Sequence, residues 1–383
     1  MLEDYKLKMP GVVHGGEHAL EKIIEIITDK YKKPAVFTDK GIEAAGILEE
    51  PFRLIKESGA EMYLIDEIPP EPTYEQAQKV VDSFKESGAD FIIAIGGGSV
   101  MDIGKLSSIA ATDDYRVKDL LDNPLLGKKT VKTLMIPTTA GTGAEATPNA
   151  IVAVPEKELK VGIVNEEMVP DYVILDGRMT ARLPKKIAAA TGIDALAHAI
   201  ECYTSNKANP FSNIFAMEAL RLIFSNIEKA CEDSSAVKEK SNMLLAAFYA
   251  GVAITASGTT AVHALSYPLG GKYHIPHGVS NAMMLLPVME FNKEACIDEL
   301  VEIYDVVEGK EKESKEEKAA WVIDRIGEMI KRLEIPDSLN AYGIGHEDLE
   351  ELTKAGMEVQ RLLVNNKRAV TAQDARELYL KIM

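Results

Sequence analysis

Cysteine is scarce in this sequence. Its 383 residues include three cysteines, Cys202, Cys231 and Cys296, and no Cys-x-x-Cys pair. An odd number of widely spaced cysteines argues against a disulfide framework and against a thiolate metal site. We therefore expect a protein of the cytoplasm.

Long apolar runs and an excess of positive charge are also missing. No stretch approaches the ~20 apolar residues of a membrane-spanning helix, and the opening MLEDYKLKMP lacks the apolar core of a signal peptide. The 43 lysines and arginines are outnumbered by 60 aspartates and glutamates, which gives a net charge of −17. Such a surface repels phosphate backbones and anionic lipids, so we expect neither nucleic acid nor a membrane as a partner.

The composition that is present is globular, with 46% hydrophobic and 27% charged residues. A single hydrophobic core stops growing near roughly 250–300 residues, so a chain of 383 residues predicts two domains.

Short apolar segments alternate with helical periodicity in the first half of the chain, which favours a parallel α/β sheet. From Lys185 onward the spacing is helical throughout. We therefore expect an α/β domain over 1–184 and an all-helical domain over 185–383. The expected strands are 8–13, 34–37, 62–65, 91–95, 133–136 and 172–175, with an extended pair at 150–154 and 160–164 and an amphipathic helix over 17–31.

Glycines follow the strand expected at 91–95, in the segment FIIAIGGGSVMDIGK over 91–105. Gly97 and Gly98 let the backbone approach a pyrophosphate closely, and the helix that follows offers free N–H groups and the positive end of its dipole. The alternative is a tight turn from strand to helix, and Ser99 suits the helix N-cap in either case.

A second loop rich in small residues, IPTTAGTGAEAT over 136–147, follows another expected strand. Its hydroxyl and backbone donors suit contacts with phosphate, ribose or nicotinamide, whereas a plain polar loop is the alternative. Two such loops in one α/β domain favour a dinucleotide site.

Asp39 directly follows the strand expected at 34–37. An acid there accepts hydrogen bonds from the adenosine ribose and repels the 2′-phosphate of NADP, which predicts a preference for NAD. A helix N-cap or turn aspartate is the alternative.

Histidines gather in the helical half, where Asp194 and His198 are spaced i, i+4 on one helix face. His263 and His277 follow. One carboxylate and three imidazoles predict a site for one divalent metal, Zn(II) or Fe(II), with no thiolate to favour zinc, although a lone histidine is usually structural.

The segments GGGSVMDIGK, PTTAGTGAEAT, DALAHAIE and VHALSYPLGGKYHIPHG together resemble the iron-containing (group III) alcohol dehydrogenases, and the similarity runs from end to end. The resemblance implies a Rossmann-like dinucleotide-binding domain and an all-α metal-binding domain, the dehydroquinate synthase-like fold. It also implies an active site in the cleft between the domains and a homodimer or larger homo-oligomer.

The resemblance also implies roles for individual residues. The metal ligands are Asp194, His198, His263 and His277. The cofactor-binding residues are Asp39, Gly97, Gly98, Ser99, Asp102, Thr138, Thr139, Thr142 and Lys160. Asn149, Ile151 and Thr255 face the substrate space, with a purely structural role as the alternative for each.

The chain departs from the family pattern at three places. Many members carry a histidine that relays the alcohol proton four residues after the third ligand, and this chain has Tyr267. Tyr267, His274 or water are the alternatives for that role. The usual Asn-Pro after the third strand is Glu71-Pro72, and Ala144 and Ala146 replace Ser and Val.

The predicted function is a metal-dependent, NAD(H)-linked alcohol dehydrogenase or aldehyde reductase. It transfers hydride reversibly between a small primary alcohol or diol and nicotinamide, and the metal polarises the substrate oxygen. A sugar-phosphate cyclase or lyase of the dehydroquinate synthase type is one alternative, but it needs basic residues to hold a phosphate and the metal-site helices offer Lys272 and little else. A catalytically inactive binding protein on the same fold is another.

Overall fold

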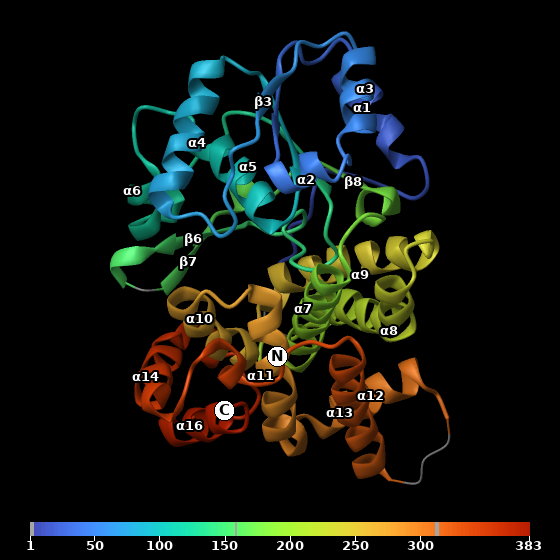
Figure 1. The fold of residues 1–383 in the computed structure, drawn as a ribbon, viewed down its shortest axis with the longest axis vertical. Coiled ribbons are helices and arrows are strands. Elements are labelled where there is room, and N and C mark those ends of the chain that lie inside the picture. The colour runs from blue at the N-terminus through green and yellow to red at the C-terminus, as the bar shows by residue number, and fades with distance from the viewer. Residues whose placement is uncertain (1–3, 158, 311–313) are drawn as a thin grey trace. The chain divides into compact units, whose positions relative to one another are not determined.

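The computed structural model describes residues 4–157, 159–310 and 314–383, which form two compact units (Figure 1). The α/β unit comprises Lys8–Leu183 and Ser234–Phe248, and the helical unit comprises 4–7, Pro184–Asp233 and Tyr249–Met383. The division falls between Leu183 and Pro184, but the α/β unit also takes in part of the predicted helical domain. It does so because α9 (Val237–Ser257) begins in the α/β unit, where Ser241 packs directly against Gly177.

A parallel six-stranded sheet forms the centre of the α/β unit, in the order β1-β8-β5-β4-β2-β3. The connections from β1 through to β5 run through α-helices, whereas the connection from β5 to β8 contains an antiparallel hairpin. The strands are β1 (Val12–Gly15), β2 (Pro34–Phe37), β3 (Tyr63–Ile65), β4 (Phe91–Gly96), β5 (Thr133–Pro137) and β8 (Tyr172–Leu175). The helices are α1 (Lys22–Ile27), α2 (Lys40–Ala44), α3 (Glu49–Glu57), α4 (Tyr74–Ser87), α5 (Gly98–Ala110) and α6 (Val117–Asp122).

Both faces of this sheet are covered, which explains why its central strands are mostly apolar. On one face Phe91, Ile93 and Ile95 pack with α1 and α3 in a single buried cluster. On the other face α5 lies so close to β4 that a Cβ on Gly104 would stand 3.1 Å from the Ala94 side chain. The carboxyl ends of β4 and β5 therefore carry the two loops that the sequence analysis singled out.

Two predicted elements near the N-terminus are wrong in their bounds. The first strand is Val12–Gly15 rather than 8–13, because Pro10 has no N–H to donate and pairing with β8 begins at Val12 and Tyr172. The helix predicted over 17–31 is a 3-10 turn, Ala19–Glu21, followed by α1, which ends at Ile27. The backbone is left-handed at His18 and Asp29, which confines the helix to the residues between them.

An antiparallel hairpin, β6 (Asn149–Val154) and β7 (Leu159–Val164), follows the second loop. It forms its own two-stranded sheet. Its burial alternates along β6, as expected for a strand with one covered face.

The helical unit contains no strand among its described residues. Its helices are α7 (Lys185–Thr204), α8 (Pro210–Glu232), the end of α9, α10 (Ala261–Tyr273), α11 (His277–Asn292), α12 (Ile297–Val307), α13 (Lys315–Arg332), α14 (Leu349–Glu358), α15 (Gln360–Leu363) and α16 (Ala372–Leu380).

Helix α7 lies at the centre of this unit, packed against α8 and α11, and α11 packs against α10. Small residues allow these close approaches. A Cβ on Gly278 would stand 2.4 Å from the carbonyl oxygen of Ala190, so only glycine fits there. The start of α11 therefore lies directly on the backbone of α7.

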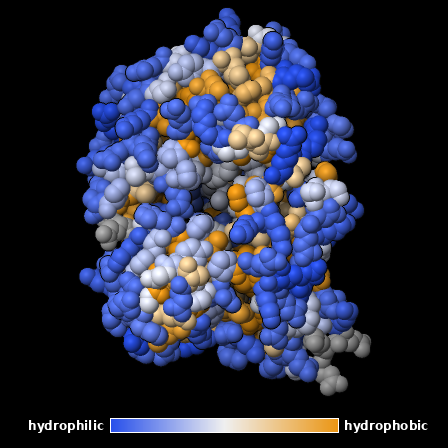
Figure 2. Space-filling model, viewed as in Figure 1, coloured by the Kyte–Doolittle hydropathy of each residue, from blue (hydrophilic) through white to orange (hydrophobic). Residues whose placement is uncertain are grey.

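Hydrophilic side chains dominate the face of the molecule seen in Figure 2. Among the described residues no single helix is long and apolar enough to cross a membrane. Helices α9 and α10 pass the same test of length and composition only as a pair, which is bent by 107°.

Candidate metal centre and cofactor loops

Four predicted ligands converge in the helical unit. Asp194 and His198 come from α7, one turn apart, His263 comes from α10 and His277 is the first residue of α11. One potential ligand atom from each residue lies within 4.8 Å of all the others. The packing of α10 and α11 around α7 thus brings together residues that are more than eighty positions apart in the chain.

This donor set fits a divalent metal. Ligand atoms about 2.0–2.2 Å from one ion lie roughly 3–4.5 Å from one another. The imidazole nitrogens Nε2 of His198 and His263 are 2.9 Å apart, and Asp194 Oδ1 is 3.7 Å from Nε2 of both His263 and His277. Imidazole and carboxylate ligands without thiolate suit Fe(II), Zn(II) and related ions.

The electrostatics of the cluster favour a cation. Asp194 is almost completely buried, which disfavours its charged form, but the neighbouring imidazoles and the Asn281 amide outweigh burial and lower the pKa of Asp194. An ionised carboxylate in such a place needs a positive partner. A divalent ion held by these four residues would supply it.

Glu201 is a functional residue that the sequence analysis missed. Its Oε2 accepts a hydrogen bond from Nδ1 of His263, and its Oε1 accepts from the N–H groups of Thr260 (3.0 Å) and Val262 (2.9 Å) and from the Thr260 hydroxyl (2.6 Å). One buried carboxylate thus caps the start of α10 and directs Nε2 of His263 toward the other ligands. The signal was available, because Glu201 lies three residues after His198 on the same helix face.

Asn281 was also missed, although it lies four residues after His277. Its side-chain amide donates to Asp194 Oδ1 (2.6 Å), while its nitrogen lies 3.0 Å from Nε2 of His263 and 3.1 Å from Nε2 of His277. Its oxygen accepts from the Ser266 hydroxyl, which fixes the amide's orientation. Asn281 therefore holds the Asp194 carboxylate toward the histidines.

We expect Glu201→Gln to weaken metal binding about 10–100-fold, the range for loss of an outer hydrogen-bond partner of a ligand. A glutamine has one oxygen, so it cannot accept both from His263 and from the start of α10. Competition with a chromophoric chelator measures the dissociation constant. Glu302→Gln removes an exposed carboxylate of the same unit that accepts from Tyr203, and it should leave metal affinity unchanged. Equal affinities in both variants and the wild type would contradict the role of Glu201.

The two residues predicted to relay a proton occupy different settings. Tyr267 lies one turn after His263 on α10, and its ring centroid is 6.2 Å from that of His277. Burial raises the pKa of Tyr267, an effect that the Arg361 guanidinium opposes by its charge and its hydrogen bond. His274 is exposed in a left-handed conformation at the end of α10.

In the α/β unit the two predicted cofactor loops lie against each other. A Cβ on Gly98 would stand 2.9 Å from the Thr142 side chain, and one on Gly97 would stand 3.5 Å from Thr139. Gly97 is the N-cap of α5 and has no side chain to cap the helix, so the first N–H groups of α5 remain available for a phosphate. The buried hydroxyl of Thr138 has no hydrogen-bond partner among the described residues. These features fit a dinucleotide.

Ser99 and Lys160 meet at Glu71, the residue that departs from the family's asparagine. Ser99 accepts from the Glu71 N–H (3.1 Å), and Lys160 Nζ is 2.6 Å from Glu71 Oε1. Ser99 lies inside α5, so the prediction that it is the N-cap is wrong. Any phosphate bound by Lys160 competes with the Glu71 carboxylate.

Asp102 belongs to a buried network that ties α5 to the second loop. Its Oδ1 pairs with Lys105 Nζ at 2.9 Å, and its Oδ2 accepts from the N–H of Ile151 at 2.9 Å. Lys105, fully buried, also donates to the Ala144 carbonyl (2.9 Å) and the Thr147 hydroxyl (3.2 Å). Lys105 and Asp102 thus hold the threonine loop and the start of the hairpin in place.

Glu145 lies in the same loop with its carboxyl group almost completely buried. Its Oε1 has no hydrogen-bond partner among the described residues. Burial raises the pKa of Glu145 from 4.5 to about 7. The folded protein therefore keeps this carboxyl group protonated at a pH where the unfolded chain has lost the proton.

This shift predicts a loss of stability as the pH rises. The contribution of protonated Glu145 is complete below pH 4.5 and is lost as the pH rises through about 7, about 3 kcal/mol in total. Glu145→Gln keeps the shape without the titration, so its stability relative to the wild type should increase by about 2–3 kcal/mol between pH 5 and pH 8. Urea unfolding at both pH values measures this difference. A difference that does not change with pH would rule out a buried titration at Glu145.

Asp39 is the N-cap of α2, where its Oδ1 accepts from the N–H of Ile42 at 3.0 Å. The alternative that the sequence analysis left open, a capping aspartate, is therefore present, and the other carboxylate oxygen is left for a ligand.

The predicted substrate residues come from two elements. Asn149 and Ile151 lie on β6 and are partly buried. Thr255 lies near the end of α9, and its hydroxyl donates to the Val252 carbonyl.

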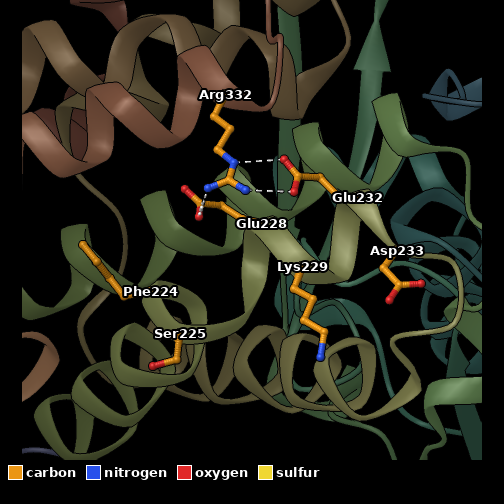
Figure 3. A pocket seen from close by; sticks show the side chains of 7 residues that line it. All are labelled: Phe224, Ser225, Glu228, Lys229, Glu232, Asp233 and Arg332. Atoms are coloured by element: carbon orange, nitrogen blue, oxygen red, sulfur yellow. Dashed lines mark hydrogen bonds and ion pairs between the residues drawn. The ribbon is translucent and has the colours of Figure 1, made fainter.

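A separate polar hollow opens between α8 and α13 (Figure 3). Arg332 is one of its lining residues, and the guanidinium donates to both carboxylate oxygens of Glu232 and to Glu228. Its charge is thus already compensated, and none of the four candidate ligands lines this hollow.

Two protein-family sequence models match the chain. The one for iron-containing alcohol dehydrogenase matches residues 10–177, and the one for the C-terminal part of the Fe-containing alcohol dehydrogenase family matches residues 188–383. The chain belongs to the iron-containing alcohol dehydrogenase family. It is 31% identical to long-chain-alcohol dehydrogenase 1 of Geobacillus thermodenitrificans over 379 residues, which cover 98% of this chain and 95% of that protein.

Solved structures of the iron-containing alcohol dehydrogenase family share the fold. A 1,3-propanediol oxidoreductase superposes with a TM-score of 0.92 at 28% identity, covering 100% of both chains. The NAD⁺ complex of sulfoacetaldehyde reductase from Bifidobacterium kashiwanohense superposes with a TM-score of 0.89 at 26% identity, covering 100% of this chain and 99% of that one.

The predicted family, the fold class and the assignment as an NAD-linked alcohol dehydrogenase are confirmed by these matches. The protein is an oxidoreductase, and a cyclase or lyase of the dehydroquinate synthase type is not favoured.

Proposed function

We propose that this protein interconverts a small primary alcohol or diol and its aldehyde, with NAD(H) preferred over NADP(H) and Fe(II) as the resident metal. The observation that carries the proposal is the buried cluster of Asp194, His198, His263 and His277, with Glu201 hydrogen-bonded behind it. A divalent metal at this place supplies Lewis-acid polarisation of the substrate oxygen. Zn(II) suits the same donors.

The protein's own residues have three tasks in this proposal. The four ligands hold the metal, Glu201 keeps the tautomer of His263 that presents Nε2, and Asn281 orients Asp194. Tyr267, beside His277, is the first candidate to pass the alcohol proton, and exposed His274 is the second. Water is the third.

The cofactor is assigned to the loops of the α/β unit. The free N–H groups at the start of α5 and the dipole of that helix suit the pyrophosphate at Gly97, Gly98 and Ser99. Thr138, Thr139, Thr142, Lys160 and Asp102 are the further cofactor residues of the proposal. Asp39 has one carboxylate oxygen beyond its capping bond for the ribose hydroxyls, and its charge disfavours a 2′-phosphate.

We further propose that the nucleotide of the α/β unit and the metal of the helical unit serve one active site. Asn149, Ile151 and Thr255 are its candidate substrate residues. The domain bounds 1–184 and 185–383, the cytoplasmic location and the homo-oligomer stay predictions.

The test follows oxidation of NADH and NADPH with a panel of short aldehydes, hydroxyaldehydes and semialdehydes. The protein is first stripped of metal and then assayed anaerobically without metal, with Fe(II) and with Zn(II). We expect turnover that needs metal and is faster with NADH than with NADPH. Absence of turnover with either metal, in a protein that still binds NAD⁺, would refute the proposed function.

A further inference from the structure

Arg361 on α15 is unusual among the arginines of this chain. Each of the other arginines has a carboxylate within ion-pair distance, except Arg182, which donates to the carbonyls of Ala45 and Gly46. Across the described residues no carboxylate lies within ion-pair distance of Arg361. Its guanidinium lies close enough to the Tyr267 hydroxyl to oppose the rise in the pKa of that group. Its positive charge is therefore uncompensated, in a chain whose net charge is −17.

Tyr267 connects Arg361 with the metal ligands. It lies one turn after His263 on α10, so both side chains project from the same face of that helix. Its ring centroid is 6.2 Å from that of His277. Helix α15, which carries Arg361, packs against α10. The guanidinium is thus one phenol group away from the ligand cluster.

This is also the accessible side of the cluster. The side chain of His277 is 30% exposed, whereas those of Asp194 and His263 are 2% and 3% exposed. A small molecule that reaches the cluster from solvent therefore passes His277 and its neighbour Tyr267. Arg361 is itself exposed, so it can meet such a molecule without leaving its place.

The lysine on α10 is already paired with a carboxylate. Lys272, further along α10, forms an ion pair with Glu351. The acidic surface as a whole repels anions, so an anionic substrate needs a local cation to bind. A guanidinium offers a planar pair of N–H donors that matches a carboxylate better than an ammonium does.

We propose that Arg361, positioned by Tyr267, binds the carboxylate of a short substrate whose aldehyde or alcohol group lies at the ligand cluster. The inference rests on the proposed function and narrows its substrate class to semialdehydes and the corresponding hydroxy acids. Tyr267 acts here as a positioning residue, because its hydroxyl lies beside the guanidinium on the helix against which α15 packs.

The test compares succinic semialdehyde with butanal, which has the same number of carbons and no carboxylate. For Arg361→Gln we expect the ratio of kcat/KM for succinic semialdehyde to kcat/KM for butanal to fall about tenfold or more, as for loss of a hydrogen bond to a charged group. The same ratio for Arg361→Lys should lie between those of the wild type and of Arg361→Gln. Arg376→Gln, which removes an exposed arginine paired with Glu350 in the same unit, is the matched control and should leave the ratio unchanged.

A binding measurement separates this inference from the proposed function. In the wild type, 4-hydroxybutyrate should raise the melting temperature more than 1-butanol does, and Arg361→Gln should remove that difference. The inference would be overturned if the ratio of the two kcat/KM values stayed constant in Arg361→Gln or fell equally in Arg376→Gln. Turnover of butanal in the same proteins would still support the proposed function. Binding of 4-hydroxybutyrate that depends on Arg361, without turnover of any aldehyde, would instead uphold the anion site and refute the proposed function.

Discussion

Replacing His263 by alanine is expected to remove metal binding and activity together. His263 is the central imidazole of the cluster, with its Nε2 2.9 Å from that of His198 and its Nδ1 bonded to Glu201. Its loss takes away one ligand and leaves Oε2 of the buried Glu201 carboxylate without the N–H that His263 donates. Metal affinity should fall by more than roughly 100-fold, the upper limit for removing a residue that only hydrogen-bonds to a ligand. The value of kcat/KM at limiting metal should fall in parallel.

Metal content after dialysis and the chelator-competition constant check this expectation. His346→Ala makes the same substitution at an exposed histidine of the helical unit and should bind metal like the wild type. If the His263→Ala protein retained a full equivalent of tightly bound metal, the four-ligand assignment would be wrong. A melting temperature that no longer rises when metal is added gives a second readout independent of activity.

Replacing Lys105 by methionine should cost about 3–5 kcal/mol of unfolding free energy, the range for breaking a buried ion pair by removing one partner. Lys105 is fully buried and its partner Asp102 nearly so. Without the ammonium the Asp102 carboxylate is left in an apolar setting that already raises its pKa. The carbonyl of Ala144 also loses its donor, so the threonine loop should become mobile and NAD⁺ binding should weaken.

The double variant Asp102→Asn, Lys105→Met removes both charges. The amide oxygen that Asp102→Asn introduces can still accept from the N–H of Ile151. It should regain a large part of the lost stability, which a double-mutant cycle measures by urea unfolding. Lys22→Met breaks an exposed pair with Glu25 in the same unit and should change stability by less than about 1 kcal/mol. Equal losses for Lys105→Met and Lys22→Met would contradict a buried pair.

Local patterns predicted most of the sheet but not its first strand. The segments at 34–37 and 172–175 are strands at the predicted residues, because a continuous apolar run is typical of a strand in a parallel sheet that is covered on both faces. The first is buried at all four positions and the second at all but Tyr172. The segment at 8–13 (KMPGVV) is only partly apolar, and Pro10 and the register against β8 move the strand to Val12–Gly15. Register depends on the partner strand, which a local pattern does not contain.

The candidate site shows the same division. The spacing of Asp194 and His198 places them on one helix face whatever the rest of the chain does, and residue type made His263 and His277 candidates. Their convergence depends on Gly278, whose missing side chain lets α11 lie on the backbone of α7 at Ala190. Helical spacing alone could have added Glu201 to the residues on this helix face. Its role, however, depends on α10, because the Glu201 carboxylate accepts from N–H groups at the start of that helix.

The sequence by itself therefore determined the family, the α/β and helical halves and the identity of the candidate ligands, because these depend on residue type and on spacings within one or two turns. Tertiary structure decided which of these groups are engaged with one another. It placed Lys105 against the Ala144 carbonyl and paired Lys160 with Glu71. It also placed Glu201 behind His263, and among the described residues it left Arg361 without a carboxylate partner. Such pairings join residues from separate helices, strands and loops, and only the packing of these elements brings their polar atoms within hydrogen-bond distance.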